Sequence, residues 1–583
     1  MARVSSDTVP STHAAKRGET RRDEARSWQA RLRRYGYTPP PHASVRGRLV
    51  PPQPKPGRTP WSALGIEPRW RGWGGPLLVA LFAGLLRFWQ LGTPHAVIFD
   101  ETYYAKDAWS LLQFGYEAQW GDNANDLILA DNPTVPLSED PSYVVHPPMG
   151  KWVIAIGLRL FGLEPFGWRF MVALLGTLSV LMLCRIGRRL FRSTALGCLA
   201  GGLLAVDGLH LVMSRTALLD LVLMFFVLAA FGALLVDRDR SRARLAAALP
   251  EDRPDPLIAA TAKLGLRPWR LLAGVCLGLA VGTKWSGLYV LAAFGLLTVL
   301  WDVSARRTAG ARRPYRAVLR RDAVPAFLSL VPVALVVYLA SWTGWFATRG
   351  GYFRGWADNR RGLSPDEVTL PLLGRISLPQ FDMTWVPAPL RSLWHYESEV
   401  YSFHRQLTSE HRYESNPWSW LVAGRPVSYH YNSRELGAEG CMEPSGCARE
   451  VLALGTPMLW WVGVAALVYA LYRWVLRRDW RAGAILCGLA AGYLPWFLYQ
   501  ERTIFYFYAV VFVPFICLAV AMLLGAMAGP PGATEARRVV GLVVGGALVL
   551  LIVWNLVYFW PLYTAGELSV DEWRARMWFD TWI

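Results

Sequence analysis

Long apolar runs recur along this chain, and they limit its fold more than any other feature. Of the 583 residues, 53% are hydrophobic, and the mean hydropathy is +0.23. A helix needs about 20 mostly apolar residues to cross a bilayer, and the sequence offers about eleven such runs. An ordinary soluble globule is excluded. The sequence instead predicts an all-α integral membrane protein with about eleven transmembrane helices.

The charge distribution gives the predicted spans an orientation. The net charge of +18 does not indicate nucleic-acid binding, because the Arg residues lie in the N-terminal segment and in short loops between apolar runs. That is the positive-inside pattern. Residues 1–72, basic and rich in Pro, are predicted to be a disordered cytoplasmic tail near anionic lipid. The spans are predicted near 76–91, 166–184, 194–209, 217–236, 271–283, 286–301, 323–342, 454–472, 482–499, 504–526 and 539–560.

This arrangement divides the chain into four predicted parts, in a multi-pass protein of the cell membrane. With the N-terminus inside, every strongly basic loop is cytoplasmic and the C-terminus is extracytoplasmic. The parts are the tail 1–72, an N-terminal transmembrane half at 73–343 with an extracytoplasmic loop at 93–150, a large extracytoplasmic loop at 344–453, and a C-terminal transmembrane half at 454–583.

The seven cysteines fall into two groups. Cys441 and Cys447 lie in the large polar loop, and an oxidising exterior makes them candidates for a disulfide. The others lie in or beside apolar runs and are predicted to be packed.

Ionisable residues near the span ends are the candidates for a site, because charges at membrane depth are costly. In the predicted topology they gather on the outer face: Asp100, Glu101, His146, Lys151, Arg169, Arg215, Asp220, Lys284 and Arg502. Taken singly, each cation is equally explained as an interfacial anchor, and Arg215 as a partner of Asp220. Their convergence predicts an active site at the outer membrane surface.

These residue types suit the transfer of a sugar from a lipid phosphate. Cations beside an apolar surface bind a phosphate whose lipid tail stays in the bilayer, and they stabilise the charge that develops when it leaves. A carboxylate can deprotonate an acceptor hydroxyl, and direct displacement with one base inverts the anomeric centre. Asp100 and Glu101 are adjacent and point about 100° apart in a helix, so one is the base and the other binds acceptor or orients a neighbour. A simple helix cap is the alternative interpretation of this pair.

No compact set of His, Asp and Glu indicates a metal or other cofactor, although Asp100 and Glu101 together could hold a metal ion. A secondary transporter is the alternative from another class. Transporters show internal repeats and binding residues near the midplane. This sequence shows no repeat, and its charges lie at the span edges.

Five motifs together resemble the protein O-mannosyltransferases, in particular the bacterial, actinobacterial-type members. The resemblance runs from the first span to the C-terminal end, and the order and spacing of the motifs are specific. The motifs are Phe99–Lys106 (FDETYYAK), His146–Lys151 (HPPMGK), Arg215–Asp220 (RTALLD), Lys284–Gly287 (KWSG) and Arg502–Tyr508 (RTIFYFY).

The resemblance implies a glycosyltransferase fold of the GT-C type that transfers mannose from polyprenyl-phosphate mannose to Ser or Thr of proteins crossing the membrane. It implies Asp100 as base, Glu101 as its acceptor-binding partner, and Arg169 as the family's arginine early in the second span. Partners would be the lipid-linked donor, protein acceptors and the translocation machinery, with no nucleic acid. Phosphate contacts by Lys284 and Arg502 are inferred from position. The nearest alternative is a sister lipid-phosphate glycosyltransferase that acts on a glycan or lipid.

Overall fold

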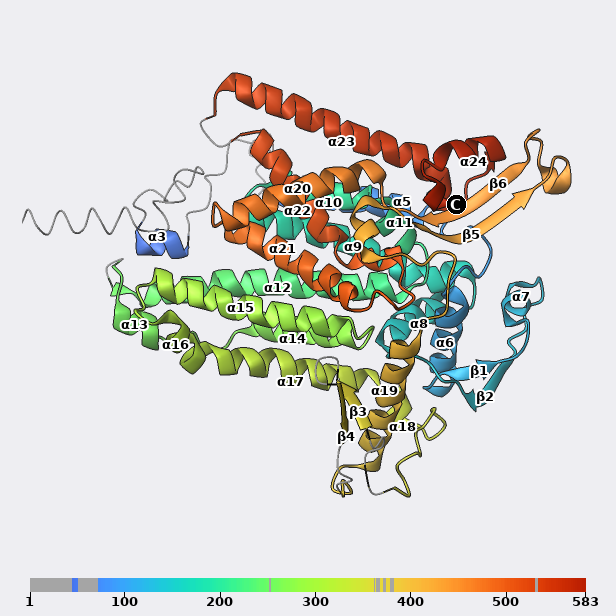
Figure 1. The fold of residues 1–583 in the computed structure, drawn as a ribbon, viewed down its shortest axis with the longest axis horizontal. Helices are drawn as coiled ribbons and strands as arrows, with labels where there is room; N and C mark the ends of the chain where they lie inside the picture. The colour runs from blue at the N-terminus through green and yellow to red at the C-terminus, as the bar shows by residue number, and fades with distance from the viewer. Residues whose placement is uncertain are drawn as a thin grey trace, which may run out of the picture.

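The computed structural model describes residues 44–50, 72–250, 253–360, 362, 367–370, 374–377, 382–529 and 533–583. The long helices lie side by side, and the connecting segments gather at the two ends of the bundle (Figure 1). We call the end with β5, β6, α6, α8 and α24 the site end. The opposite end, with α3, α13 and α16, is the basic end.

Within the described chain, seven helical segments are long and apolar enough to cross a membrane. They are α9 (Pro165–Phe191), α12 (Leu219–Ala248), α15 (Gly287–Thr308), Pro314–Ser341 with α16 (Pro314–Val318) and α17 (Val324–Ser341), α20 (Pro457–Val475), Trp480–Leu498 with α21 (Trp480–Tyr493), and α23 (Glu535–Thr564). Four shorter apolar helices join them: α5 (Gly74–Phe88), α10 (Thr194–Ala205), α14 (Pro268–Val281) and α22 (Val513–Met527).

Every predicted span coincides with one of these helices, which confirms the multi-pass, mainly helical architecture. Proline stands in the first turn of α9, α14, α20 and α22. There its fixed φ suits a helix start, and its missing N–H leaves no hydrogen bond unmade.

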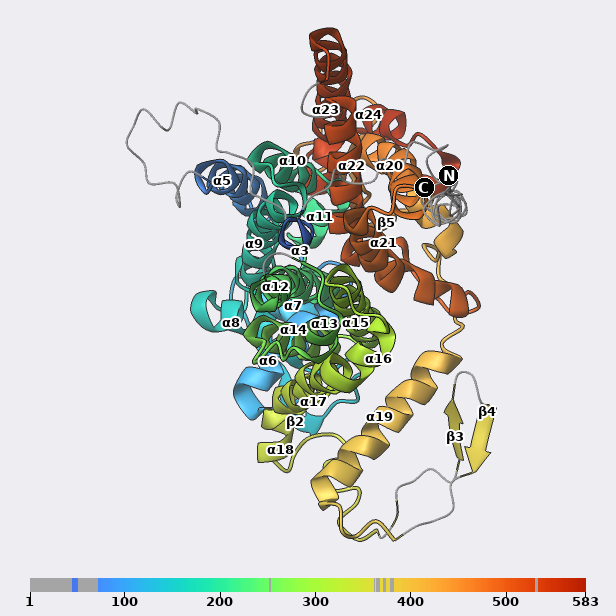
Figure 2. The ribbon, with the colours of Figure 1, turned by 90° about the vertical axis from the view of Figure 1, so that its left-hand side faces the viewer.

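Small residues let the spans approach closely. A Cβ added to Gly274 of α14 would lie 2.3 Å from the carbonyl oxygen of Ser329 in α17, and one on Gly278 would lie 2.7 Å from that of Ala334. Glycine is therefore required where α14 crosses α17, as in other membrane helix pairs. Viewed from the basic end, α12 lies inside the bundle while α5 and α23 lie at its edge (Figure 2).

The site end is built from the two predicted extracytoplasmic loops. The first contains α6 (Glu101–Phe114), β1 (Ala118–Trp120), α7 (Ala124–Leu129), β2 (Leu137–Pro141) and α8 (Met149–Phe161). The second contains α18 (Thr343–Ala347), β3 (Glu367–Leu370), β4 (Gly374–Ser377), α19 (Ala388–Gln406), β5 (Val427–Arg434) and β6 (Cys447–Ala453). Helix α11 (Gly208–Met213) lies between α10 and α12.

Small antiparallel sheets modify the all-α prediction at this end. β1 pairs with β2, β3 with β4, and β6 lies between β5 and β7 (Leu568–Ser569), which leads into α24 (Val570–Arg576). The β5–β6 register runs from Val427 opposite Ala453 to Arg434 opposite Cys447. The predicted disulfide between Cys441 and Cys447 is formed at the tip of this hairpin.

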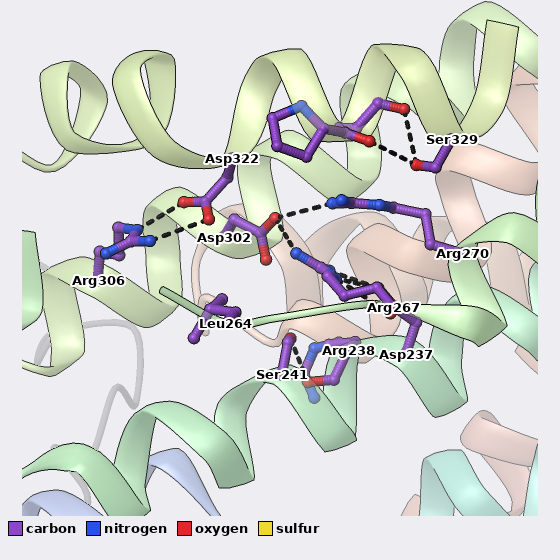
Figure 3. A network of polar contacts seen from close by, with 12 residues as sticks. Asp237, Arg238, Ser241, Leu264, Arg267, Arg270, Asp302, Arg306, Asp322 and Ser329 are labelled. Atoms are coloured by element: carbon purple, nitrogen blue, oxygen red, sulfur yellow. Dashed lines mark hydrogen bonds and ion pairs between the residues drawn. The ribbon is translucent and has the colours of Figure 1, made fainter. Parts of the chain in front are cut away.

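A buried ion-pair network holds the basic end together (Figure 3). Arg267, just before α14, bonds Asp237 of α12 and Asp302 of α15, with 2.6 Å from its Nη1 to Asp302. Arg306 of α15 bonds Asp322, which leads into α17. Because a buried charge is costly without a partner, these pairs fix the relative positions of four helix ends.

The predicted disordered tail needs a correction at one point. Residues 45–49 form the short helix α3, whose Val45 and Leu49 are buried against Leu245, Leu249 and neighbouring apolar residues at the basic end. The sequence window is too short and too basic to reveal a helix whose stability comes from docking. The rest of 1–72, apart from Ser44, Val50 and Gly72, lies outside the described residues.

Candidate active site

The acidic pair at the start of α6 separates into two different environments. Glu101 is fully buried. Its Oε1 accepts hydrogen bonds from Arg169 Nε (2.8 Å) and the Ala217 backbone N–H (3.0 Å). Its Oε2 accepts from Arg169 Nη2 (2.8 Å) and the Ile98 N–H (3.1 Å). Both oxygens are fully used inside the protein, so the geometry matches the orienting role predicted for one member of the pair and leaves none for an acceptor.

Arg169 and Arg215 hold the segment between α5 and α6 by their guanidinium groups. Arg169, fully buried, also donates to the carbonyls of Leu91, Pro94 and Ala96. Arg215 donates to four carbonyls at the end of α5, those of Leu86, Arg87, Trp89 and Gln90.

The last carbonyls of a helix have no hydrogen-bond donor within the helix, and an arginine side chain supplies the missing donors. Both arginines thus have a structural role, and their contact with substrate stays a prediction. Their partners lie far away in sequence, so the motifs do not reveal them.

Lys151 is likewise engaged inside the protein. Its Nζ is buried and forms ion pairs with Glu117, beside β1, and with Asp107 of α6, at 3.7 Å. Lys151 thus ties the start of α8 to α6 and β1, and its contact with substrate stays a prediction.

Asp100, by contrast, has a free carboxylate. It immediately precedes α6 and is partly exposed, and no hydrogen bond from a residue described here reaches its side chain. Burial raises the pKa of Asp100 to about 6, with nearby Asp220 adding to the rise and Lys284 opposing it. A carboxylate of this kind is suited to accept a proton near neutral pH.

Backbone strain and aromatic packing position Asp100. The preceding residue, Phe99, has a φ of +47°, a left-handed conformation that costs about 1–3 kcal/mol for a residue with a side chain. Its ring stacks on Tyr429 of β5, with centroids 4.5 Å apart, and meets Phe507 edge-on at 5.6 Å. These contacts keep the strained turn in place, so Asp100 is held rather than free to swing.

Lys284 and Asp220 form an ion pair at the same site. Lys284 Nζ lies 2.7 Å from Asp220 Oδ2 and 5.3 Å from the centre of the Tyr508 ring. The structure therefore pairs Asp220 with Lys284 rather than with Arg215, the pairing that sequence spacing offered. Lys284 is mostly buried in the turn between α14 and α15.

Arg502 and His146 meet at a histidine that the sequence analysis missed. His404, in the last turn of α19, lies 2.9 Å from Arg502 Nη2 through Nδ1 and 2.9 Å from the Val145 carbonyl through Nε2. The His146 and His404 rings stack with centroids 5.3 Å apart. Burial, together with the charges of Arg502 and Lys284, lowers the pKa of both histidines, to about 4 for His404. A lone His in an aromatic-rich loop gave no sequence signal.

These residues bring a free carboxylate and two cations to the site end. The charges of Lys284 and Asp220 both act on the pKa of Asp100, and those of Lys284 and Arg502 both lower the pKa of His146 and of His404. The groups therefore share one electrostatic environment. In the described part of the chain no three His, Cys, Asp or Glu side chains gather as a metal site would require. The sequence offered Asp100 and Glu101 as a possible pair of metal ligands. In the structure the Glu101 carboxylate is instead ion-paired with Arg169.

The fold and this site together define a membrane-embedded glycosyltransferase. Two family models match the chain: "Dolichyl-phosphate-mannose-protein mannosyltransferase" over residues 162–341, and "C-terminal four TMM region of protein-O-mannosyltransferase" over residues 389–582. The polyprenol-phosphate-mannose–protein mannosyltransferase of Mycolicibacterium smegmatis is 39% identical over 555 residues, covering 94% of this chain and 99% of that protein. The enzyme of the same name from Corynebacterium glutamicum is 33% identical over 520 residues, covering 87% and 91%. The chain belongs to the protein O-mannosyltransferase family.

A solved structure shares the fold across nearly the whole chain. The S. cerevisiae protein O-mannosyltransferase Pmt1–Pmt2 complex bound to the sugar donor matches with a TM-score of 0.63 at 15% identity. The match covers 90% of this chain and 94% of the yeast chain. This agrees with the predicted fold of a lipid-phosphate-dependent membrane glycosyltransferase.

Proposed function

We propose that this protein transfers mannose from polyprenyl-phosphate mannose to Ser or Thr hydroxyls of proteins at the outer face of the cytoplasmic membrane. The observation that carries the proposal is the contrast between the two acidic residues. Asp100 has a free carboxylate with a pKa raised to about 6, while its neighbour Glu101 is saturated by Arg169 and backbone N–H groups. One base, positioned by a second carboxylate, suits a direct displacement.

The proposed reaction is a single inverting step. Asp100 takes the proton of the acceptor hydroxyl while the hydroxyl oxygen forms a bond to the anomeric carbon of mannose. The bond from that carbon to the phosphate oxygen breaks, and polyprenyl phosphate leaves with the electron pair. Lys284 and Arg502 stabilise the negative charge on the leaving phosphate. The lipid-linked sugar is a substrate, and these steps use no other small molecule.

An apolar groove supports a donor with a lipid tail. It lies between α15 and α17, lined by Leu288, Leu291, Phe327 and Leu330 among others. Leu288, in the first turn of α15, is four residues after Lys284 in the sequence. A phosphate at Lys284 could thus extend its isoprenoid chain down this groove within the bilayer.

The side of the membrane is proposed from charge and cysteine chemistry. Arginines cluster at the basic end, as at a cytoplasmic face. The Cys441–Cys447 disulfide at the site end fits an oxidising exterior. An acceptor chain would then meet the site as it emerges, next to the translocation machinery.

The test is transfer by the purified enzyme from polyprenyl-phosphate mannose to a Ser/Thr peptide, followed by mass spectrometry. The expected product is a peptide with one added hexose. Asp100→Asn should slow transfer by about 10²–10⁴-fold. The matched control is Asp122→Asn, which removes an exposed carboxylate from the same loop. Transfer to a glycan or lipid acceptor but never to peptide would identify the sister glycosyltransferase instead.

A further inference from the structure

Helix α19 brings one histidine from the large loop into the site. The helix lies across the ends of the spans (Figures 1 and 2). His404, in its final turn, bonds Arg502. Its middle is fixed to the segment before α8, because the Tyr396 hydroxyl bonds both the N–H (3.1 Å) and the carbonyl (3.0 Å) of Val144. His404 is therefore held by a rigid element and not by a loose loop.

The partners of His404 determine its tautomer. The Val145 carbonyl can only accept, so Nε2 carries the hydrogen and donates. The Arg502 guanidinium can only donate, so Nδ1 is unprotonated and accepts. Both bonds require a neutral ring, and the low pKa of His404 agrees with this requirement.

Arg502 still has donors to offer once His404 has bound one of them. Its Nη2 is used on His404, whereas its Nε is buried and makes no hydrogen bond with any residue in the described ranges. A buried N–H without a partner is unfavourable, and an anion of suitable geometry satisfies it. The arginine guanidinium is planar and presents its N–H donors in fixed directions. Its binding to an anion therefore depends on how it is oriented.

We infer that His404 is a positioning residue that orients the Arg502 guanidinium toward the phosphate of the lipid-linked donor. The inference rests on the proposed function, which supplies that phosphate. A neutral imidazole is well suited to the task, because it accepts a hydrogen bond without neutralising the arginine. A carboxylate at residue 404 would pair with Arg502 and weaken its attraction for the donor.

Two substitutions separate the halves of the interaction. In His404→Asn the amide oxygen takes the place of Nδ1, so the acceptor for Arg502 is kept and the bond to Val145 is lost. In His404→Gln the amide nitrogen takes the place of Nε2, so the bond to Val145 is kept and the acceptor is lost. The measurement is KM and kcat for polyprenyl-phosphate mannose at saturating peptide, KM for the peptide, and inhibition by polyprenyl phosphate.

His404→Gln should raise the donor KM and the inhibition constant of polyprenyl phosphate by about tenfold, the equivalent of about 1.4 kcal/mol. The peptide KM should stay unchanged, and His404→Asn should stay within about twofold of the parent. The inference would be overturned if the donor KM and the inhibition constant of polyprenyl phosphate were the same in all three proteins. It would also be overturned if both constants rose equally in the two variants. If the parent enzyme itself gave no mannosyl peptide, the proposed function would fail. Direct binding of polyprenyl phosphate to the three purified proteins, measured by thermal shift, would still report on His404.

Discussion

At the scale of residues, adjacent carboxylates acquire different chemistry from their surroundings. Asp100 and Glu101 are neighbours in the sequence. The Glu101 carboxylate accepts four hydrogen bonds, whereas the Asp100 carboxylate accepts none from the described residues. Because burial destabilises the charged form of a carboxylate that lacks such bonds, Asp100 is poised to take up a proton near neutral pH.

The pH dependence of the reaction follows from this difference. A base is active when deprotonated, and the pKa of Asp100 is raised to about 6. We expect kcat/KM to be flat above about pH 6 and to fall tenfold per pH unit below it. His146 and His404 have lowered pKa values and stay neutral across this limb, so they do not contribute.

The measurement is kcat/KM from about pH 5 to about pH 8, compared with the residual activity of Asp100→Asn. The acid limb should vanish in that variant. An acid limb that persists without Asp100 would assign it to another group.

At the scale of elements, buried arginines fix the spans relative to the catalytic loop. The Glu101–Arg169 pair joins the start of α6 to α9, and both side chains are completely buried. Arg169 reaches onward to the carbonyls of the α5–α6 segment. The basic end uses the same device, in the Arg267 network of Figure 3. Both ends of the bundle are thus held by charges that the bilayer does not solvate.

Glu101→Gln should therefore destabilise the fold, not merely slow the enzyme. It leaves the Arg169 charge buried without a counter-ion. Removing one partner of a buried ion pair lowers the free energy of unfolding by about 3–5 kcal/mol. We expect a lower thermal midpoint in detergent together with loss of transfer.

Asp100→Asn is the matched control for this experiment. It removes the neighbouring carboxylate, which has no ion-pair partner within 4.0 Å among the described residues, and its thermal midpoint should match the parent. A stable Glu101→Gln with full activity would contradict the positioning role of Glu101.

At the scale of the whole molecule, the two ends of the bundle differ in chemistry. The docked N-terminal helix α3 lies at the basic end, and the C-terminus lies at the site end (Figure 1). Helix α3 and the C-terminus therefore lie at opposite ends of the bundle. The site end also carries the disulfide and the three small sheets.

Labelling of single introduced cysteines tests which end faces outward. Asp122→Cys places an exposed thiol at the site end, and Arg312→Cys places one in the basic loop after α15. In intact cells a membrane-impermeant maleimide should label Asp122→Cys at once and Arg312→Cys only after permeabilisation. The parent protein measures background from its native thiols. The reverse pattern would invert the proposed topology.

The sequence alone determined the number and place of the apolar helices, the segregation of charge and the motifs of the family. Those properties are local: hydropathy over about 20 residues decides whether a segment can cross a bilayer. It also predicted the charged residues of the candidate site, including Asp100, Lys284 and Arg502.

Only the tertiary structure decided what each charge does. Arg169 meets Glu101 across 68 residues, and Arg502 meets His404 across 98. A buried charge is stabilised by whichever partner the packing brings within about 3 Å, and no local pattern encodes that choice. Packing thus made structural anchors of Arg169, Arg215 and Lys151, left Asp100 free, and added His404 to the site.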